Sequence, residues 1–223
     1  MTGKLQVVMP GLDPGICLDT RQDTENRIVT RTINCALIGL GSVHRNLLNI
    51  LINKRDRIAR DHELAFNITL VADSSGFAGR ADGFDPAALL GLKERGGRAS
   101  ELAATFSGGT FTDSLSEIPV DLVFEASPVD LENGGPGLEI ARQALARGIH
   151  VVLANKGPVV LGFDELHALA AANDAGLAFS ATVCGGLPIL NIGQRDMVAA
   201  DVSLLRGIFN ATSNFILDEM ATG

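Results

Sequence analysis

The amino-acid sequence predicts an α/β protein built on a Rossmann-like, doubly wound parallel sheet. Two observations support this prediction. Short apolar runs of strand length alternate with segments of helical periodicity, and the first apolar run leads directly into two glycines, Gly39 and Gly41. The chain has 223 residues, of which 46% are hydrophobic, so it can hold one large domain and part of another.

The segment 33–51 is the unit around which the rest of the chain is organised. Residues 33–38 fit a buried strand, the two glycines follow at once, and apolar residues then recur every fourth position from Val43. A residue without a Cβ atom at position 41 lets a pyrophosphate approach the backbone. The helix N-terminus behind Gly41 offers free N–H groups to the same anion.

The glycine motif is incomplete, because His44 stands where Gly-x-Gly-x-x-Gly needs its third glycine. That glycine permits close packing of helix on strand. We therefore expect His44 to push the helix outward or to swing away, as a tolerated residue of the surface or of the helix–strand seam. On this interpretation, His44→Gly should tighten dinucleotide binding.

Four further apolar runs predict strands, over residues 66–72, 120–126, 150–154 and 177–183. Periodic segments predict helices over 86–94, 138–147 and 164–173, and the rest of 76–109 is expected to be irregular because of its glycines. The carboxyl ends of parallel strands meet at one edge of a sheet, where ligands bind. The residues expected at this edge are Asp73, Ser127, Pro128, Asn155, Lys156, Gly185 and Gly186.

Asp73 has two interpretations of similar weight. An acidic residue after the second strand can accept hydrogen bonds from an adenosine ribose, although the spacing here is long because the first helix continues through Arg60. Alternatively, Asp73 belongs to the turn before Gly76. Arg80 lies close enough in sequence to meet a 2′-phosphate instead, so the choice between NAD and NADP stays open.

Composition and charge exclude several classes of partner. The formal net charge is −8, there is no large basic cluster, and Trp and Tyr are absent, so nucleic acid and anionic membrane surfaces are poor candidates. The cysteines, Cys17, Cys35 and Cys184, are odd in number and form no Cys-x-x-Cys motif, which predicts neither a disulfide framework nor a zinc site. Without a membrane-spanning run or a secretory signal, we expect a cytoplasmic protein.

Residues 1–31 are rich in turn formers and then polar and aperiodic. We expect this segment to be disordered, and its sequence resembles a spurious extension from a start codon chosen too far upstream. Residues 32–200 are expected to form the dinucleotide-binding domain. Residues 201–223 are expected to begin a second domain.

Four segments, in order, resemble the homoserine dehydrogenase family. Residues 38–43 resemble its Gly-Leu-Gly-x-Val-Gly opening, and residues 148–158 resemble its lysine segment. Residues 181–189 resemble its Gly-Gly-(Ile/Leu)-Pro segment, and residues 207–217 resemble its Gly-Ile-Leu-Asn-Gly-Thr signature. The likeness runs from residue 33 to the end of the chain.

The resemblance implies NAD- or NADP-dependent interconversion of L-homoserine and L-aspartate 4-semialdehyde, in threonine and methionine biosynthesis. Lys156 would lie between nicotinamide and substrate as the catalytic residue, donating a proton or polarising a carbonyl. The substrate end would be shaped by Gly185, Gly186, Asn210, Thr212 and Ser213. The cofactor would be held by Gly39, Leu40, Gly41, Ser42, Val43, Asp73, Ser127, Pro128, Asn155 and Lys156.

The sequence also departs from the family. Ala211 replaces the glycine of the Asn-Gly-Thr signature, and Ser180 stands where many members have a Glu that helps to hold a monovalent cation, so no metal site is assigned. The chain stops at Gly223, before the family's substrate-binding acidic loop and second lysine. We therefore expect a truncated α+β substrate domain and an impaired activity, unless a homodimer or a complementing C-terminal polypeptide completes the site.

Two other functions stay open at this level. The chain could be a non-catalytic nucleotide-binding remnant. Alternatively, Cys184 could be the nucleophile of a semialdehyde dehydrogenase that forms a thiohemiacetal. The second alternative needs a paired base, and none of the four histidines lies in a comparable motif.

Overall fold

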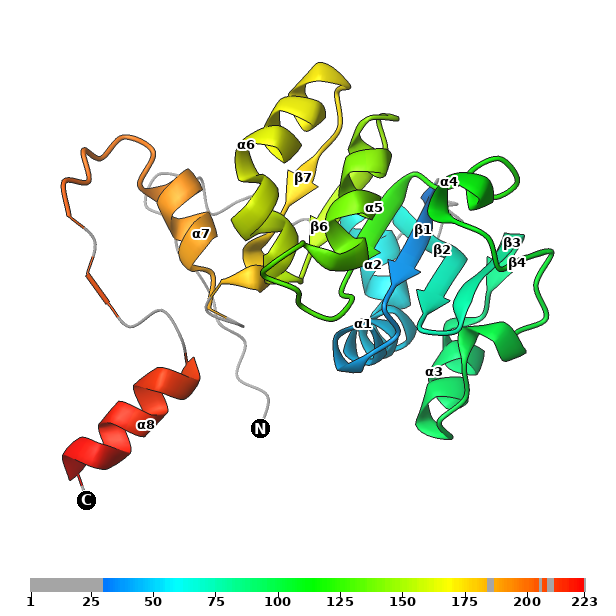
Figure 1. Cartoon of the computed structure of the whole chain (residues 1–223), viewed down its shortest axis with the longest axis horizontal. Coiled ribbons are helices and arrows are strands. Elements are labelled where there is room, and N and C mark those ends of the chain that lie inside the picture. Colours follow the sequence, from blue (N-terminus) through cyan, green and yellow to red (C-terminus); the bar gives the residue numbers. More distant parts are fainter. Residues whose placement is uncertain (1–29, 184–186, 205, 208–210, 223) are drawn as a thin grey trace, which may run out of the picture.

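The computed structural model describes residues 30–183, 187–204, 206–207 and 211–222. In this part of the chain, seven strands form one mixed sheet in the order β4-β3-β2-β1-β5-β6-β7 (Figure 1). The strands are β1 (Arg31–Ile38), β2 (Leu64–Asp73), β3 (Gly76–Phe84), β4 (Phe106–Ser107), β5 (Leu122–Glu125), β6 (His150–Leu153) and β7 (Leu177–Ala178).

Helices lie on both faces of this sheet (Figure 1). Helices α1 and α3 pack on one face and α5 and α6 on the other, which is the doubly wound arrangement. The helices are α1 (Ser42–Asn53), α2 (Arg55–His62), α3 (Pro86–Glu94), α4 (Phe111–Ser114), α5 (Gly135–Leu145), α6 (Lys156–Ala172), α7 (Ile189–Asn191) and α8 (Ala211–Thr222).

Strand β1 shows how the sequence produces these two cores. Successive side chains of a strand point to opposite faces of the sheet. Ala36 and Ile38 accordingly join the core beneath α5 and α6, whereas Leu37 joins the core beneath α1 and α3. All three side chains are buried. A continuous apolar run is therefore what a central strand covered on both faces requires.

The predicted Rossmann-like, doubly wound α/β fold is confirmed, and the structure adds an antiparallel edge to its parallel sheet. Strands β1, β2, β5, β6 and β7 are parallel, whereas β3 runs antiparallel to β2 and β4 antiparallel to β3. The segment after Asp73 was expected to be irregular because glycine has low β propensity. At Gly79, however, the strand requires glycine, because a Cβ atom there would lie 2.6 Å from Cγ1 of Ile118.

Helix α6 also differs from the prediction, since it begins at Lys156 rather than near residue 164. Asn155 caps it by accepting a hydrogen bond from the Gly157 N–H at 2.9 Å. Pro158 is tolerated because it lies in the first turn. The helix is kinked at Gly162, where φ is −130°. The Asn-Lys-Gly-Pro sequence is thus a helix start directly after β6.

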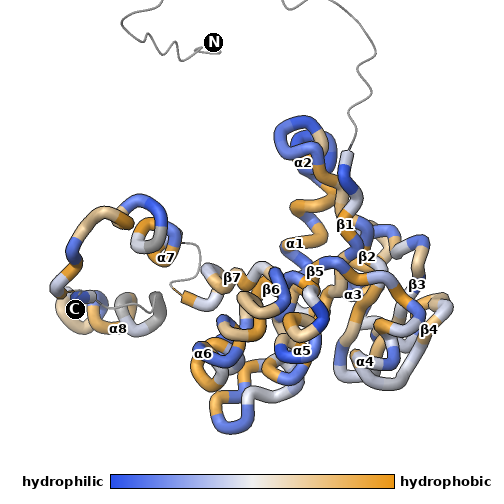
Figure 2. Tube along the Cα trace, turned by 90° about the horizontal axis from the view of Figure 1, so that it is seen from above, coloured by the Kyte–Doolittle hydropathy of each residue, from blue (hydrophilic) through white to orange (hydrophobic). Residues whose placement is uncertain are grey.

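The remaining segments lie outside the sheet or outside the described residues. Helix α2 is mostly hydrophilic (Figure 2), and none of its residues is buried. Helix α8 lies away from the sheet (Figure 1), with Phe215, Ile216 and Leu217 at least half exposed. Segment 1–31 was expected to be disordered, and its residues 1–29 lie outside the described residues. None of the helices in the described ranges is long and apolar enough to cross a membrane.

Candidate functional site

A cavity of about 930 Å³ opens at the carboxyl edge of the sheet, between the ends of β1 and β5. The chain builds the sheet outward from β1 in one direction and then resumes at β5 on the other side, so this is the topological switch point. Three groups of residues line the cavity: the turn from Gly39 to Val43, the end of β2 with Lys93 and Arg98, and the loop after β5 with Asn155.

A glycine is required at position 39 because the turn after β1 contacts the loop after β5. Its φ is +85°, and a Cβ atom would lie 2.5 Å from the Ala126 carbonyl oxygen and 2.8 Å from Ser127 Cα. The Gly39 N–H donates to the Ala72 carbonyl at 2.8 Å. The turn after β1 is therefore packed against the backbone of the β5 loop, and only glycine fits there.

Gly41 is different, because a Cβ atom at this position would meet nothing within 4 Å. It is the N-cap of α1, and no side chain caps this helix. The first N–H groups of α1 and its positive dipole end therefore lie beside the cavity. A glycine with open space around its missing Cβ leaves room for an anion at the backbone.

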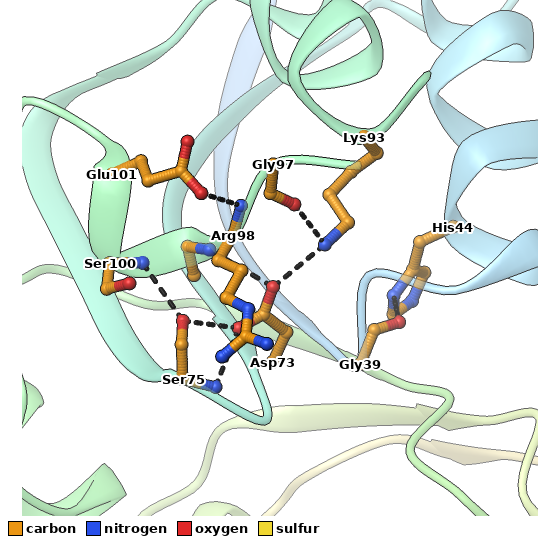
Figure 3. A network of polar contacts seen from close by, with 10 residues as sticks. Gly39, His44, Asp73, Ser75, Lys93, Gly97, Arg98, Ser100 and Glu101 are labelled. Atoms are coloured by element: carbon orange, nitrogen blue, oxygen red, sulfur yellow. Dashed lines mark hydrogen bonds and ion pairs between the residues drawn. The ribbon is translucent and has the colours of Figure 1, made fainter. Parts of the chain in front are cut away.

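His44 neither swings away nor lies on the surface. It is 2% exposed, and its Nδ1–H donates to the Gly39 carbonyl at 2.8 Å (Figure 3). Burial lowers the pKa of the imidazole to about 4, against the opposing effect of this hydrogen bond. The neutral ring fills the helix–strand seam and holds the glycine turn, so the expected benefit of His44→Gly loses its basis.

Asp73 ends β2 at the centre of a polar network (Figure 3). Its Oδ1 accepts hydrogen bonds from the N–H and the hydroxyl of Ser75, at 2.9 and 2.6 Å. Its Oδ2 accepts from Lys93 Nζ at 2.9 Å and from the Ala99 N–H at 3.0 Å. Burial would raise the pKa of Asp73, but these hydrogen bonds outweigh it and lower the pKa to about 2.

The sequence therefore missed two cationic residues of this site. Lys93 and Arg98 line the cavity beside Asp73, whereas Arg80 is not among the lining residues and pairs with Asp82. Lys93 also donates to the Gly97 carbonyl at 2.7 Å, which ties the glycine-rich loop to α3. The signal available was a pair of basic residues flanking two glycines just after a predicted helix.

Ser127, Pro128 and Asn155 lie together as expected from their positions at two strand ends. Asn155 is 1% exposed, and its Nδ2 donates to Ser127 Oγ at 3.3 Å and to the Pro128 carbonyl at 3.4 Å. All three residues line the cavity. The end of β6 is thus fastened to the loop after β5.

Lys156 follows Asn155 as the first residue of α6, but its side chain is exposed and does not line the cavity. Of the expected substrate residues, Thr212 and Ser213 lie in α8. Gly185, Gly186 and Asn210 lie outside the described residues, as does Cys184. Ser180 begins a short 3₁₀ helix, and its hydroxyl donates to Asn191 Oδ1 at 3.5 Å. The described residues contain no group of three His, Cys, Asp or Glu side chains that could hold a metal ion.

No protein-family model matches the chain. The NAD(+)-dependent homoserine dehydrogenase of Pseudomonas canavaninivorans is 32% identical over 196 residues, which cover 84% of this chain and 54% of that protein. A putative homoserine dehydrogenase from Archaeoglobus fulgidus superposes with a TM-score of 0.69 at 30% identity, over 84% of this chain and 54% of that one. Over the matched residues, the chain is homologous to the homoserine dehydrogenases.

A third relative is a hyperthermophilic archaeal homoserine dehydrogenase solved in complex with NADPH. It has a TM-score of 0.62 and 28% identity, over 73% of this chain and 48% of that one. The chain spans about half the length of the curated homoserine dehydrogenases it matches. The matched half contains the doubly wound sheet.

The two glycines provide a test of the site's architecture. Gly39→Ala should destabilise the fold by about 2 kcal/mol or more, because it combines a positive φ with a backbone clash. Gly41→Ala should change stability by less than about 1 kcal/mol, since its Cβ enters open space. Chemical denaturation of both variants measures the difference, and equal losses of stability would contradict it.

His44 should make stability depend on pH. Its pKa is about 4 in the folded chain and near 6.5 in the unfolded one, so the unfolded state binds more protons between these values. The stabilisation is complete above about pH 6.5 and is lost as the pH falls toward 4. Between pH 6.5 and pH 5 the free energy of unfolding should fall by about 2 kcal/mol.

The measurement compares the free energy of unfolding at pH 7 and pH 5 for the natural chain and for His44→Asn. The asparagine amide nitrogen takes the place of Nδ1, so it can still donate to the Gly39 carbonyl, but it does not titrate. Carboxylates elsewhere titrate in both proteins and cancel in the difference. Equal losses in the two proteins would show that His44 is not the titrating group.

Proposed function

We propose that this chain binds a nicotinamide dinucleotide in the switch-point cavity and supports the homoserine dehydrogenase reaction, in which L-homoserine and L-aspartate 4-semialdehyde interconvert. The observation that carries the proposal is the pairing of two different glycines at the end of β1. Gly39 fixes the turn against the β5 loop, and Gly41 leaves the N-terminus of α1 open to an anion.

The residues of the cavity fit a dinucleotide from end to end. The pyrophosphate would lie on the backbone at Gly41 and at the start of α1, where N–H groups and the helix dipole favour negative charge. The adenosine ribose would lie near Asp73 at the end of β2. Ser127 and Asn155, at the ends of the next two parallel strands, would contact the nicotinamide half. The bound cofactor supplies the acceptor for hydride from the substrate alcohol.

Lys156 is the proposed catalytic residue. Oxidation of the homoserine hydroxyl releases a hydride to the oxidised cofactor and a proton to a base or to water. An ammonium group beside the reacting oxygen stabilises the developing alkoxide, and in the reverse direction it can give the aldehyde oxygen a proton. Lys156 directly follows Asn155, which lines the cavity, and its side chain is exposed.

The network around Asp73 favours NADP over NAD. Each carboxylate oxygen of Asp73 already accepts two hydrogen bonds, so neither is free for the ribose hydroxyls of NAD without breaking a contact. Lys93 and Arg98 bring two positive charges to the same end of the cavity. A 2′-phosphate is the cofactor group that such charges would stabilise.

The wider assignments belong to the same proposal. The substrate end would be completed by Gly185, Gly186, Asn210, Thr212 and Ser213 within a domain that begins near residue 201. A homodimer or a complementing polypeptide would cover the exposed apolar residues of α8. The reaction would serve threonine and methionine biosynthesis in the cytoplasm.

Lys156→Ala tests the proposed chemistry. Turnover of homoserine, followed by absorbance of the reduced cofactor, should fall about 10²–10⁴-fold. The affinity for NADPH should change by no more than about threefold, since Lys156 does not line the cavity. Lys54→Ala, at the far end of α1, is the matched control and should change neither quantity.

Two outcomes would contradict this proposal in different ways. Failure of the natural chain to bind either dinucleotide at millimolar concentration would remove the proposed function. Binding together with turnover that Lys156→Ala leaves unchanged would remove Lys156 from the chemistry. Binding without any turnover in the natural chain would identify a nucleotide-binding module instead.

Cofactor preference is tested at Lys93 and Arg98. Arg98→Ala should weaken NADPH binding about 10-fold or more, the value of a charged hydrogen bond, and should leave NADH binding nearly unchanged. Lys93→Ala should weaken NADPH and strengthen NADH, because it also releases Asp73 Oδ2 for the ribose. Arg80→Ala is the control, since Arg80 pairs with Asp82 outside the cavity. Equal effects on both cofactors would contradict the assignment.

A further inference from the structure

Two walls of different chemistry line the cavity at the end of β2, because successive residues of a strand point to opposite faces of the sheet. Asp73 points to the face that α3 covers, where Lys93 Nζ donates to it at 2.9 Å (Figure 3). Ala72 points to the other face and joins the core beneath α5 and α6. The proposed ribose and 2′-phosphate contacts belong to the polar wall, and the adenine ring of the dinucleotide has no contact among them.

The second wall is apolar. Four apolar side chains line the cavity and belong to, or pack against, the core beneath α5 and α6: Ile38, Ala72, Phe77 and Ile140. Three of these side chains are at most 6% exposed, whereas Phe77 is only partly buried. A ligand that carries a flat apolar ring next to an anionic group would match this pair of walls.

Phe77 reaches the apolar wall because β2 and β3 form a tight antiparallel hairpin. Asp73 pairs with Gly76, so only two residues form the turn, and Phe77 pairs with Ala72. Residues directly opposite each other on two strands point to the same face of the sheet. The hairpin therefore returns the chain to the cavity four residues after Asp73, whereas a parallel strand in this place would need a long crossover connection.

The ring of Phe77 is fixed on its core side. It packs against Phe111, with the ring centroids 6.3 Å apart and the planes tilted by 34°. Phe111 is 3% exposed, whereas Phe77 keeps part of its surface at the cavity. The Phe77 carbonyl accepts from the Gly108 N–H at 2.9 Å, which ties its backbone to the residue after β4. Phe77 is therefore an aromatic surface that is held in place before a ligand binds.

We propose that the apolar wall binds the adenine ring of the dinucleotide, and that Phe77 is the residue that determines the strength of this contact. The inference rests on the proposed dinucleotide function and adds an adenine site to it. Adenine presents a π face, and stacking of a base on an aromatic side chain is favourable. Because NADH and NADPH contain the same adenine ring, the contact stabilises both cofactors equally.

The guanidinium of Arg98, on the polar wall, is the other group that could contact an adenine ring, since a cation over a π face is also favourable. The apolar wall is the better match. It offers carbon atoms from four side chains to a buried ring. On the polar wall, the same ring would remove water from the charges of Asp73, Lys93 and Arg98 without replacing the lost hydration.

Phe77→Leu removes the π face and keeps an apolar side chain against Phe111. The dissociation constants of NADH and NADPH, measured by calorimetry, should both rise about 10-fold. Phe66→Leu is the matched control, because Phe66 is also partly buried and its ring centroid lies 6.4 Å from that of Phe124. Phe66 lies at the amino end of β2, away from the cavity, so this variant should change both constants by less than about twofold.

Phe77→Trp provides an optical test, since the chain contains no tryptophan or tyrosine. ADP is the probe, because it carries the adenine and the pyrophosphate but does not absorb in the range of tryptophan emission. ADP should quench the emission of Phe77→Trp in a saturable way, because the base stacks on the indole. It should leave the emission of Phe66→Trp unchanged. A purely structural role of Phe77 gives no such quenching.

Unchanged affinity of Phe77→Leu for both cofactors, or emission of Phe77→Trp that ADP leaves unchanged, would overturn the role of Phe77 while the natural chain still binds dinucleotide. Loss of NADH affinity in Arg98→Ala, together with unchanged affinity in Phe77→Leu, would place the adenine ring on the polar wall instead. If Phe77→Trp does not fold, Phe77→Leu and its control decide the question. Absence of NADH and NADPH binding by the natural chain would overturn both proposals.

Discussion

The contact between the turn after β1 and the loop after β5 is the constraint on which the rest of the site depends. Gly39 brings its backbone against Ala126 and Ser127 at a distance that no side chain permits. This approach occurs at the topological switch point, and Gly39, Ala126 and Ser127 all line the cavity. His44 reinforces it from behind by holding the Gly39 carbonyl. Position 44 is the place of the third glycine in the Gly-x-Gly-x-x-Gly motif, but here a histidine side chain stabilises the turn by a hydrogen bond to the Gly39 carbonyl.

Charge is distributed along the cavity in a way that matches a dinucleotide. At the end of β2, Asp73 is ionised but fully hydrogen-bonded, and Lys93 and Arg98 leave that end positive. At the centre, the uncapped start of α1 offers N–H groups. Beyond the switch point the site is buried, with Glu125 and Asn155 packed beneath the surface. Under the proposed function, each region would stabilise a different part of the dinucleotide by a different interaction.

Two helix starts give rigidity to the half of the site beyond the switch point. Asn155 caps α6 with its side-chain oxygen while its nitrogen reaches the loop after β5. Gly137 lets the first turn of α5 descend onto the same side chain and onto Glu125. One asparagine thus connects a strand end, a helix N-terminus and the opposite loop. Such a shared partner holds cavity-lining groups in fixed geometry.

The sequence by itself determined the fold class, the strand–glycine–helix unit and the set of strand-end residues, because alternating apolar periodicity and strand ends are local properties. It did not determine the strand β3, the helical start at Lys156, the burial of His44 or the roles of Lys93 and Arg98. Strand β3 and the network around Asp73 depend on groups distant in sequence. Ile118 packs at Gly79, and the Asp73 carboxylate receives Lys93 and Ala99 from 20 and 26 residues away. Only the tertiary structure could bring these groups together.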